Sequence, residues 1–101
     1  MAQTVAPVFV MEPKGSHQND TTISAATSFT CPDTANGVLI SALAQDVNFT
    51  LDGTTPTATL GLTLKADDTV IFIAMYGGQV IKVIEQAASA TINLQFVKLG
   101  G

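Results

Sequence analysis

The chain has little of what most enzymes and nucleic-acid-binding proteins depend on. It contains no Trp and no Arg, one Cys, one His and four Lys, and charged residues make up 12% of its 101 residues, about half the usual share. A single Cys excludes an internal disulfide framework and a cysteine-rich zinc site. The chain has only four Lys and a formal net charge of −4, which argues against a basic surface that binds a phosphate backbone. We therefore expect no nucleic-acid partner.

Long apolar runs are also missing. The longest strongly apolar stretch, residues 70–76, is much shorter than the ~20 residues of a membrane helix. The first twenty residues have no positively charged region ahead of an apolar core and do not predict a secretory signal. We expect a soluble protein that folds in a cytoplasm and has no membrane partner.

The residues that are present predict strands. The length gives room for one domain, the apolar share is 47%, and neutral polar residues include 14 Thr. Strict alternation of apolar and polar residues predicts half-buried strands at residues 46–51, 59–64 and 91–96. In the second of these segments, Leu60, Leu62 and Leu64 are predicted to face the core.

Three further segments complete the pattern. Residues 37–43 and 69–75 are apolar on both faces, which is typical of central strands or of strands covered by another subunit, and residues 79–85 alternate less cleanly. Turn-forming Pro, Gly, Asn and Asp separate the segments roughly every ten residues. The sequence therefore predicts an all-β fold, a small β-sandwich of jelly-roll or Ig-like type with about seven or eight strands, at residues 21–101.

Residues 1–20 are predicted to form an N-terminal arm or edge strand followed by a linker. Residues 4–11 are apolar but contain Pro7, which cannot donate to a central ladder, and the polar residues 12–20 predict a loop. The apolar part is either an edge strand or an extended arm that adds to the sheet of a neighbouring chain. The candidate interface residues are Val5, Val8, Phe9, Val10 and Met11.

Residues suited to chemistry are few and scattered. His17 lies in the polar linker without a second ligand at metal spacing. Cys31 has no His near it in sequence and indicates a buried structural thiol. Asp67 and Asp68 indicate a turn rather than a calcium loop, and residues 76–78 fit either a ligand-binding loop or a flexible hairpin end. We expect no enzyme activity, no catalytic residues, no cofactor and no metal site.

The sharpest local motif consists of Asp52, Gly53, Thr54 and Pro56. Asp52 is placed to accept N–H bonds from the residues after it, Gly53 tolerates a positive φ, and Pro56 fixes φ beyond the turn. The motif predicts a tight structural turn between the strands at residues 47–51 and 60–64, or a rim loop presented to a partner.

The same stretch resembles a known family. Residues 37–62 contain an alternating strand that ends in TLDG, then TPTATLG and a second alternating strand, and residues 90–96 add a closing strand. Over roughly residues 36 to 98 this pattern resembles small structural proteins of tailed phages. The resemblance implies a β-sandwich that decorates or cements the virion head, or in some members lies at the neck or tail, and it implies no catalytic residues.

The TLDGTTPT core is also similar to Ig-like accessory modules of bacterial glycoside hydrolases, although this chain has no Trp and a single Tyr. We expect a non-enzymatic head decoration or cement protein that binds the outer capsid as an oligomer, with a trimer favoured. Its partners would be the major capsid protein and other copies of itself. It would be made in the bacterial cytoplasm and reside in the virion. The alternatives are a neck, tail or head-fibre-base component and a carbohydrate-binding accessory module with an exposed aromatic platform.

Overall fold

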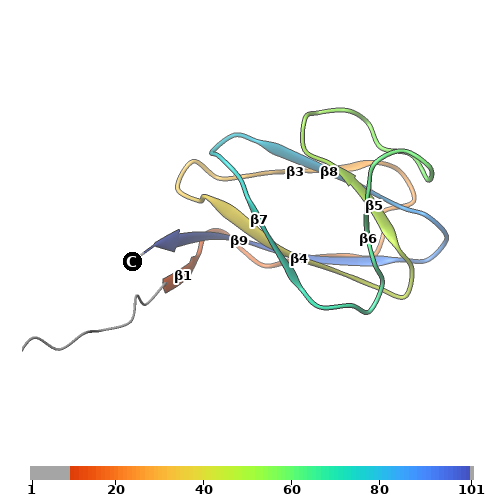
Figure 1. Cartoon of the computed structure of the whole chain (residues 1–101), viewed down its shortest axis with the longest axis horizontal. Helices are drawn as coiled ribbons and strands as arrows, with labels where there is room; N and C mark the ends of the chain where they lie inside the picture. Colours follow the sequence, from red (N-terminus) through yellow and green to blue (C-terminus); the bar gives the residue numbers. More distant parts are fainter. Residues whose placement is uncertain (1–9, 101) are drawn as a thin grey trace, which may run out of the picture.

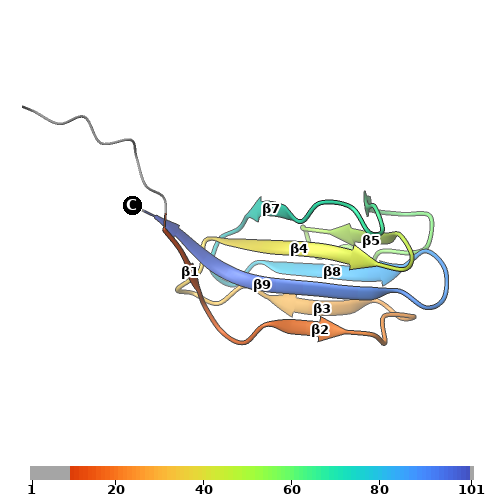
Figure 2. The same ribbon diagram turned by 90° about the horizontal axis from the view of Figure 1, so that it is seen from below.

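The computed structural model of the chain describes residues 10–100, which form strands and no helix. The strands are β1 (Val10–Pro13), β2 (Gln18–Asp20), β3 (Thr27–Thr30), β4 (Gly37–Leu43), β5 (Val47–Thr50), β6 (Leu62–Leu64), β7 (Ile71–Ala74), β8 (Val80–Glu85) and β9 (Thr91–Gly100). One antiparallel sheet has the order β1-β9-β4-β7, with β2 also paired to β9, and the other has the order β3-β8-β5-β6 (Figures 1 and 2). The predicted all-β sandwich is confirmed.

The strand pairing is that of a jelly roll rather than an Ig-like sandwich. β2 pairs with β9, β3 with β8, β4 with β7 and β5 with β6, so the chain forms one long antiparallel ribbon. The ribbon is rolled up so that β9 also pairs with β4 and β8 with β5, which builds the two sheets. β1 precedes the ribbon and pairs with the far end of β9.

The core fills the space between the sheets. It comes mainly from alternating residues of β4, β5, β8 and β9, in agreement with the two-residue period of the sequence. The buried core residues on these strands are Val38, Ile40, Ala42, Val47, Phe49, Ile81, Val83, Ile92, Leu94 and Phe96. These four strands occupy the centres of the two sheets, and the other strands lie at the edges.

The prediction of a loop or linker at residues 12–20 is wrong in part. The end of β1 and the whole of β2 lie within this segment, and both strands pair with β9. Their side chains are polar and mostly exposed, so the hydrophobic pattern gives no signal although the backbone completes a sheet edge. From residue 21 onward the described chain contains seven strands, β3 to β9, in agreement with the seven or eight predicted, and β1 and β2 are additional.

For the outer strands, one prediction is wrong and one of two alternatives is excluded. Of the three leucines predicted to face the core, only Leu64 is buried, whereas Leu60 and Leu62 are 46% and 60% exposed. The reason is that β6 is a three-residue strand at the edge of its sheet. Residues 69–75 contain β7, which is an edge strand and not a central one. Cover by another subunit, the other alternative for β7, stays a prediction.

Candidate interaction surface

Most of the large apolar side chains that remain exposed gather on one side of the sandwich. The short turn at residues 44–46 joins β4 to β5 in the opposite sheet, so their outer neighbours β7 and β6 border the same side (Figure 1). Of the nine large hydrophobic residues exposed within residues 10–100, six lie on β6 and β7 or within two residues of them. These six define the β6–β7 side: Leu60, Leu62, Val70, Ile71, Phe72 and Tyr76.

The side chains of β7 alternate between the core and the outer face of its sheet. Ile71 and Ile73 stand opposite buried residues of β4 and point inward. Phe72 points outward, and its ring lies over Gly37, where an added Cβ would come within 2.3 Å of the ring. Because Gly37 has no side chain, the Phe72 ring can lie on the outer face of the sheet, where Phe72 remains 38% exposed.

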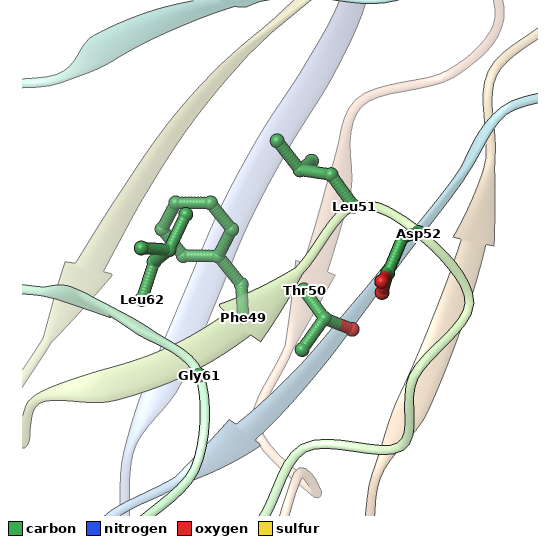
Figure 3. A pocket seen from close by; sticks show the side chains of 6 residues that line it. All are labelled: Phe49, Thr50, Leu51, Asp52, Gly61 and Leu62. Atoms are coloured by element: carbon green, nitrogen blue, oxygen red, sulfur yellow. The ribbon is translucent and has the colours of Figure 1, made fainter.

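Beside β6 the molecule has an open apolar cleft of about 310 Å³. Its lining residues are Phe49, Thr50, Leu51, Asp52, Gly61 and Leu62 (Figure 3). Leu62 is the cross-strand neighbour of Phe49, and its side chain lies beside the Phe49 ring in Figure 3. The carboxylate of Asp52 is the only charged group in the lining, so the cleft suits an apolar side chain better than a charged ligand.

The predicted turn forms one rim of this cleft. Asp52 Oδ1 accepts a hydrogen bond from Thr54 N at 3.0 Å, and Gly53 has a φ of +89°, which confirms the Asx turn. The bond from the Thr54 backbone lowers the pKa of Asp52 below its usual value. Pro56 is buried, and Thr50 Oγ1 donates to the Thr54 carbonyl. The connection is not a tight one, because it runs from residue 51 to residue 61.

A buried amide fixes this connection to the sandwich. Asn48 Nδ2 donates to the carbonyl of Thr57 at 2.9 Å. Its Oδ1 accepts from Thr63 Oγ1 at 3.1 Å and from Gln86 Nε2 at 2.7 Å. Asn48 on β5 therefore holds three segments together: the connection 51–61, strand β6 and the loop after β8.

Charged groups flank the β6–β7 side without entering its strands, since β6 and β7 contain none. In the connection between them, Lys65 Nζ lies 3.3 Å from Asp46 Oδ2, and Ala66 N donates to Asp46 Oδ1 at 2.7 Å. These bonds, above all the one from Ala66, lower the pKa of Asp46. The Asp46 carboxylate is thus bonded to two groups of the β6–β7 connection.

The candidate interface residues of the N-terminal segment are only partly described. Val10 and Met11 lie on β1, pair with the end of β9 and are 58% and 40% exposed. Val5, Val8 and Phe9 lie outside the described residues. Contact of these five residues with a partner stays a prediction.

The remaining candidate residues have structural surroundings. His17 is exposed, with Nε2 3.1 Å from Asn93 Oδ1. Cys31 is a buried structural thiol, as predicted: Sγ donates to backbone carbonyls, and burial raises its pKa, the direction opposite to that of a nucleophile. Asp67 occupies a turn with a φ of +57°, also as predicted. Residues 76–78 join β7 to β8 in the other sheet, so they are not a hairpin end.

Residues 10–100 contain neither a cluster of metal-ligating side chains nor a membrane-spanning helix. No group of three or more His, Cys, Asp and Glu side chains within this range is arranged to hold a metal ion. The same range contains no helix of the length and apolarity needed to cross a membrane.

Comparisons of the chain with protein-family models, with curated proteins and with solved structures found no significant match.

The sequence predicts the turn but not most of the β6–β7 side. Its alternation predicts that Leu60 and Leu62 face the core, and it gives no indication that they lie on the same side as Phe72. One signal was available: the apolar, uncharged segments at residues 59–64 and 69–75 follow each other in the chain. Alternation identifies the faces of a strand but not whether that strand has a neighbour on each side.

Proposed function

We propose that the chain is a non-enzymatic structural protein of a tailed-phage virion, and specifically a head decoration protein that binds the major capsid protein as an oligomer, with a trimer favoured. The observation that carries the proposal is the β6–β7 side, where exposed apolar residues border an uncharged strand edge. A concentration of exposed apolar residues on one side of a molecule is typical of protein–protein contacts. After synthesis in the host cytoplasm, the protein would reside on the outer capsid surface.

Two further points support this class of protein. Residues 36–98 resemble small phage structural proteins in their TLDG and TPTATLG pattern. Jelly rolls also occur among viral capsid domains, which is an analogy of fold and not of site.

The mechanism would be the repeated burial of apolar surface. An interface of standard size buries about 800 Å² per partner, and its strength depends on a few well-packed anchors rather than on area. Symmetry repeats the same contact over the shell, and several contacts made by one oligomer reinforce each other. Neutral Thr, Asn and Gln on the outer surface would limit repulsion between crowded copies.

Purified protein added to heads that lack it tests the proposal. The protein should sediment with the heads and saturate at a fixed ratio to the major capsid subunit. Saturation at only a few copies per head would instead indicate that the protein is a neck or tail component of the same virion. Absence of binding at every concentration would contradict the virion assignment.

A carbohydrate-binding module is a second candidate, favoured by the exposure of Tyr76. Its side chain is 70% exposed and Phe72, on the same side, is 38% exposed, so the aromatic residues that a sugar platform requires are accessible. Titration with a panel of oligosaccharides, with Tyr76→Ala as the comparison, tests this function. Saturable binding that Tyr76→Ala abolishes would support it, and silence across the panel would remove it.

A further inference from the structure

The open edge of β7 and the apolar N-terminal segment have complementary properties. We propose that residues 4–9 of one copy dock on the β6–β7 side of a second copy and add a strand along β7. The inference rests on the proposed function only in assuming that copies of the chain assemble with one another. It specifies which two surfaces meet.

β7 is a strand edge without the usual protection. Within residues 10–100 it pairs with β4 alone, so the backbone groups along its other side are available to a further strand. Soluble proteins blunt such edges with charged residues, Pro, bulges or a covering loop. Ile71–Ala74 contains neither charge nor Pro. Val70, which precedes β7, is 51% exposed, and Leu62 on β6 is 60% exposed. This composition suits strand addition by an apolar segment.

Residues 4–9 have the composition that such an edge requires. The segment TVAPVF contains two Val and one Phe and no charged residue. Pro7 is compatible with an added strand, because the added strand becomes the new edge and can turn its missing N–H outward. Six extended residues, 4–9, reach about 20 Å, which exceeds the roughly 13 Å of a four-residue strand.

The N-terminal end of β1 points past the end of β9 and away from its own β7. β4 begins at Gly37 opposite Val97, so residues 98–100 of β9 project past it, and Val10 pairs with Gly100 on this projection (Figure 2). Because β1 and β9 are antiparallel, β1 begins with Val10 at the tip of this projection and runs from there back toward the sandwich. Its own β7 lies back along the sandwich, with Ala74 opposite Gly37. A neighbouring copy placed against this end is reached without a reversal of direction.

The apolar cleft beside β6 offers a place for an anchoring side chain. It has a volume of about 310 Å³ and includes Phe49, Leu51 and Leu62 in its lining, and Phe9 is the only aromatic residue of the segment. Apolar anchors in such pockets carry much of the energy of an interface. Since the segment and the strand edge are both uncharged, two copies of this acidic chain would meet without like charges in contact.

Each copy has one segment and one edge, so the contact is head-to-tail. Contacts of this kind close into a ring when the rotation between copies allows it. In a ring of three, every segment and every edge is occupied, which agrees with the favoured trimer.

Light scattering on size-exclusion fractions of the full chain tests the inference with three variants. Leu62→Lys alters the cleft on the β6–β7 side, and Phe9→Asp alters the segment. Ser28→Lys adds the same charge at an exposed position of β3 on the opposite border. Wild type and Ser28→Lys should have three times the mass of one chain. Leu62→Lys and Phe9→Asp should each weaken the joint about 30-fold or more and become monomeric. Circular dichroism and unchanged melting confirm folding, and Val70→Lys and Val8→Asp replace any variant that fails to fold.

Mixing the two monomeric variants is the sharper experiment. Leu62→Lys keeps an intact segment and Phe9→Asp keeps an intact edge, so a 1:1 mixture should form a heterodimer with a single joint. A monomeric wild type, variants that remain oligomeric or a mixture that stays monomeric would each overturn the inference. Because the experiment uses no capsids, protein that is monomeric in solution yet still saturates phage heads would overturn this inference and leave the proposed function standing.

Discussion

Asn48 is the residue that fixes the connection at the rim of the cleft to the rest of the sandwich. Asn48→Ala removes hydrogen bonds to the Thr57 carbonyl, the Thr63 hydroxyl and the Gln86 amide. We expect it to lower the free energy of unfolding by about 2–3 kcal/mol in urea titrations. Asn19→Ala is the matched control, because this exposed Asn donates one hydrogen bond and its loss should cost about 0.5 kcal/mol or less. Equal costs for the two variants would contradict the role of Asn48.

Asp46 should make stability depend on pH in the acid range. Its pKa is lowered in the folded chain, first by the hydrogen bond from Ala66 N and then by Lys65. When a folded pKa lies below the unfolded one, the stabilisation is fully present above the ordinary value of 3.8. It is lost as the pH falls through the lowered folded value.

The substitution Asp46→Asn tests this dependence. The Asn side chain can still accept the bond from Ala66 but does not titrate. The fall in unfolding free energy between neutral pH and about pH 2, measured by urea titration at each pH, should therefore be smaller than in the wild type. An unchanged fall would show that Asp46 does not contribute to acid sensitivity.

Among the strands, the projecting end of β9 is held by a side chain where β4 has not yet begun. Asn36 Oδ1 accepts from Leu99 N at 2.7 Å, and Asn36 Nδ2 donates to the Leu99 carbonyl at 2.9 Å. This pair of bonds imitates a β-ladder and fixes the direction in which β1 points. In Asn36→Ala, amide exchange at Leu99 should become roughly tenfold faster or more, while the central Leu94 keeps its protection. Unchanged exchange at Leu99 would contradict this role.

Gly37 and Phe72 should be energetically coupled across β4 and β7. A Cβ at Gly37 would meet the Phe72 ring at 2.3 Å, so Gly37→Ala has to displace the ring, at a cost of about 1–3 kcal/mol. In a Phe72→Ala background the same change should cost much less. A double-mutant cycle based on urea unfolding measures the coupling, and additive costs would show that the ring does not occupy this position.

The sequence predicts the central strands and fails at the edges for a physical reason. Residues 37–43 and 91–96 lie in β4 and β9, where each strand has neighbours on both sides and burial follows the alternation. At residues 59–64 the alternation is equally clear, yet Leu60 and Leu62 are exposed because β6 ends its sheet. β2 escapes prediction because its side chains are polar and mostly exposed, so no hydrophobic alternation marks it.

The candidate interaction surface is likewise predictable from the sequence only in part. The Asx turn at Asp52 is predictable because its donor, Thr54, lies two residues away in the chain. The β6–β7 side is not predictable from the sequence, because it arises only when two edge strands of different sheets lie on the same side of the sandwich. The contact between Asn48 and Gln86 is equally remote in sequence, and neither residue forms a recognisable motif with its neighbours.

In the whole molecule, the rolled ribbon creates one apolar and one polar border. β6 and β7 follow each other in the chain and end different sheets on the same side. The opposite border consists of β2 and β3, whose exposed residues include Gln18, Asn19 and Ser28. Figure 2 shows β7 at one border and β2 and β3 at the other. A molecule of this kind can join neighbours along one side and face solvent on the other.

The number of copies in the virion tests the central claim most directly. Quantitative mass spectrometry of purified particles, with the major capsid subunit as the internal reference, would measure it. We predict a ratio close to the stoichiometry of the shell, because a head decoration protein occupies equivalent positions over the whole capsid. Absence of the chain from purified particles would contradict the account.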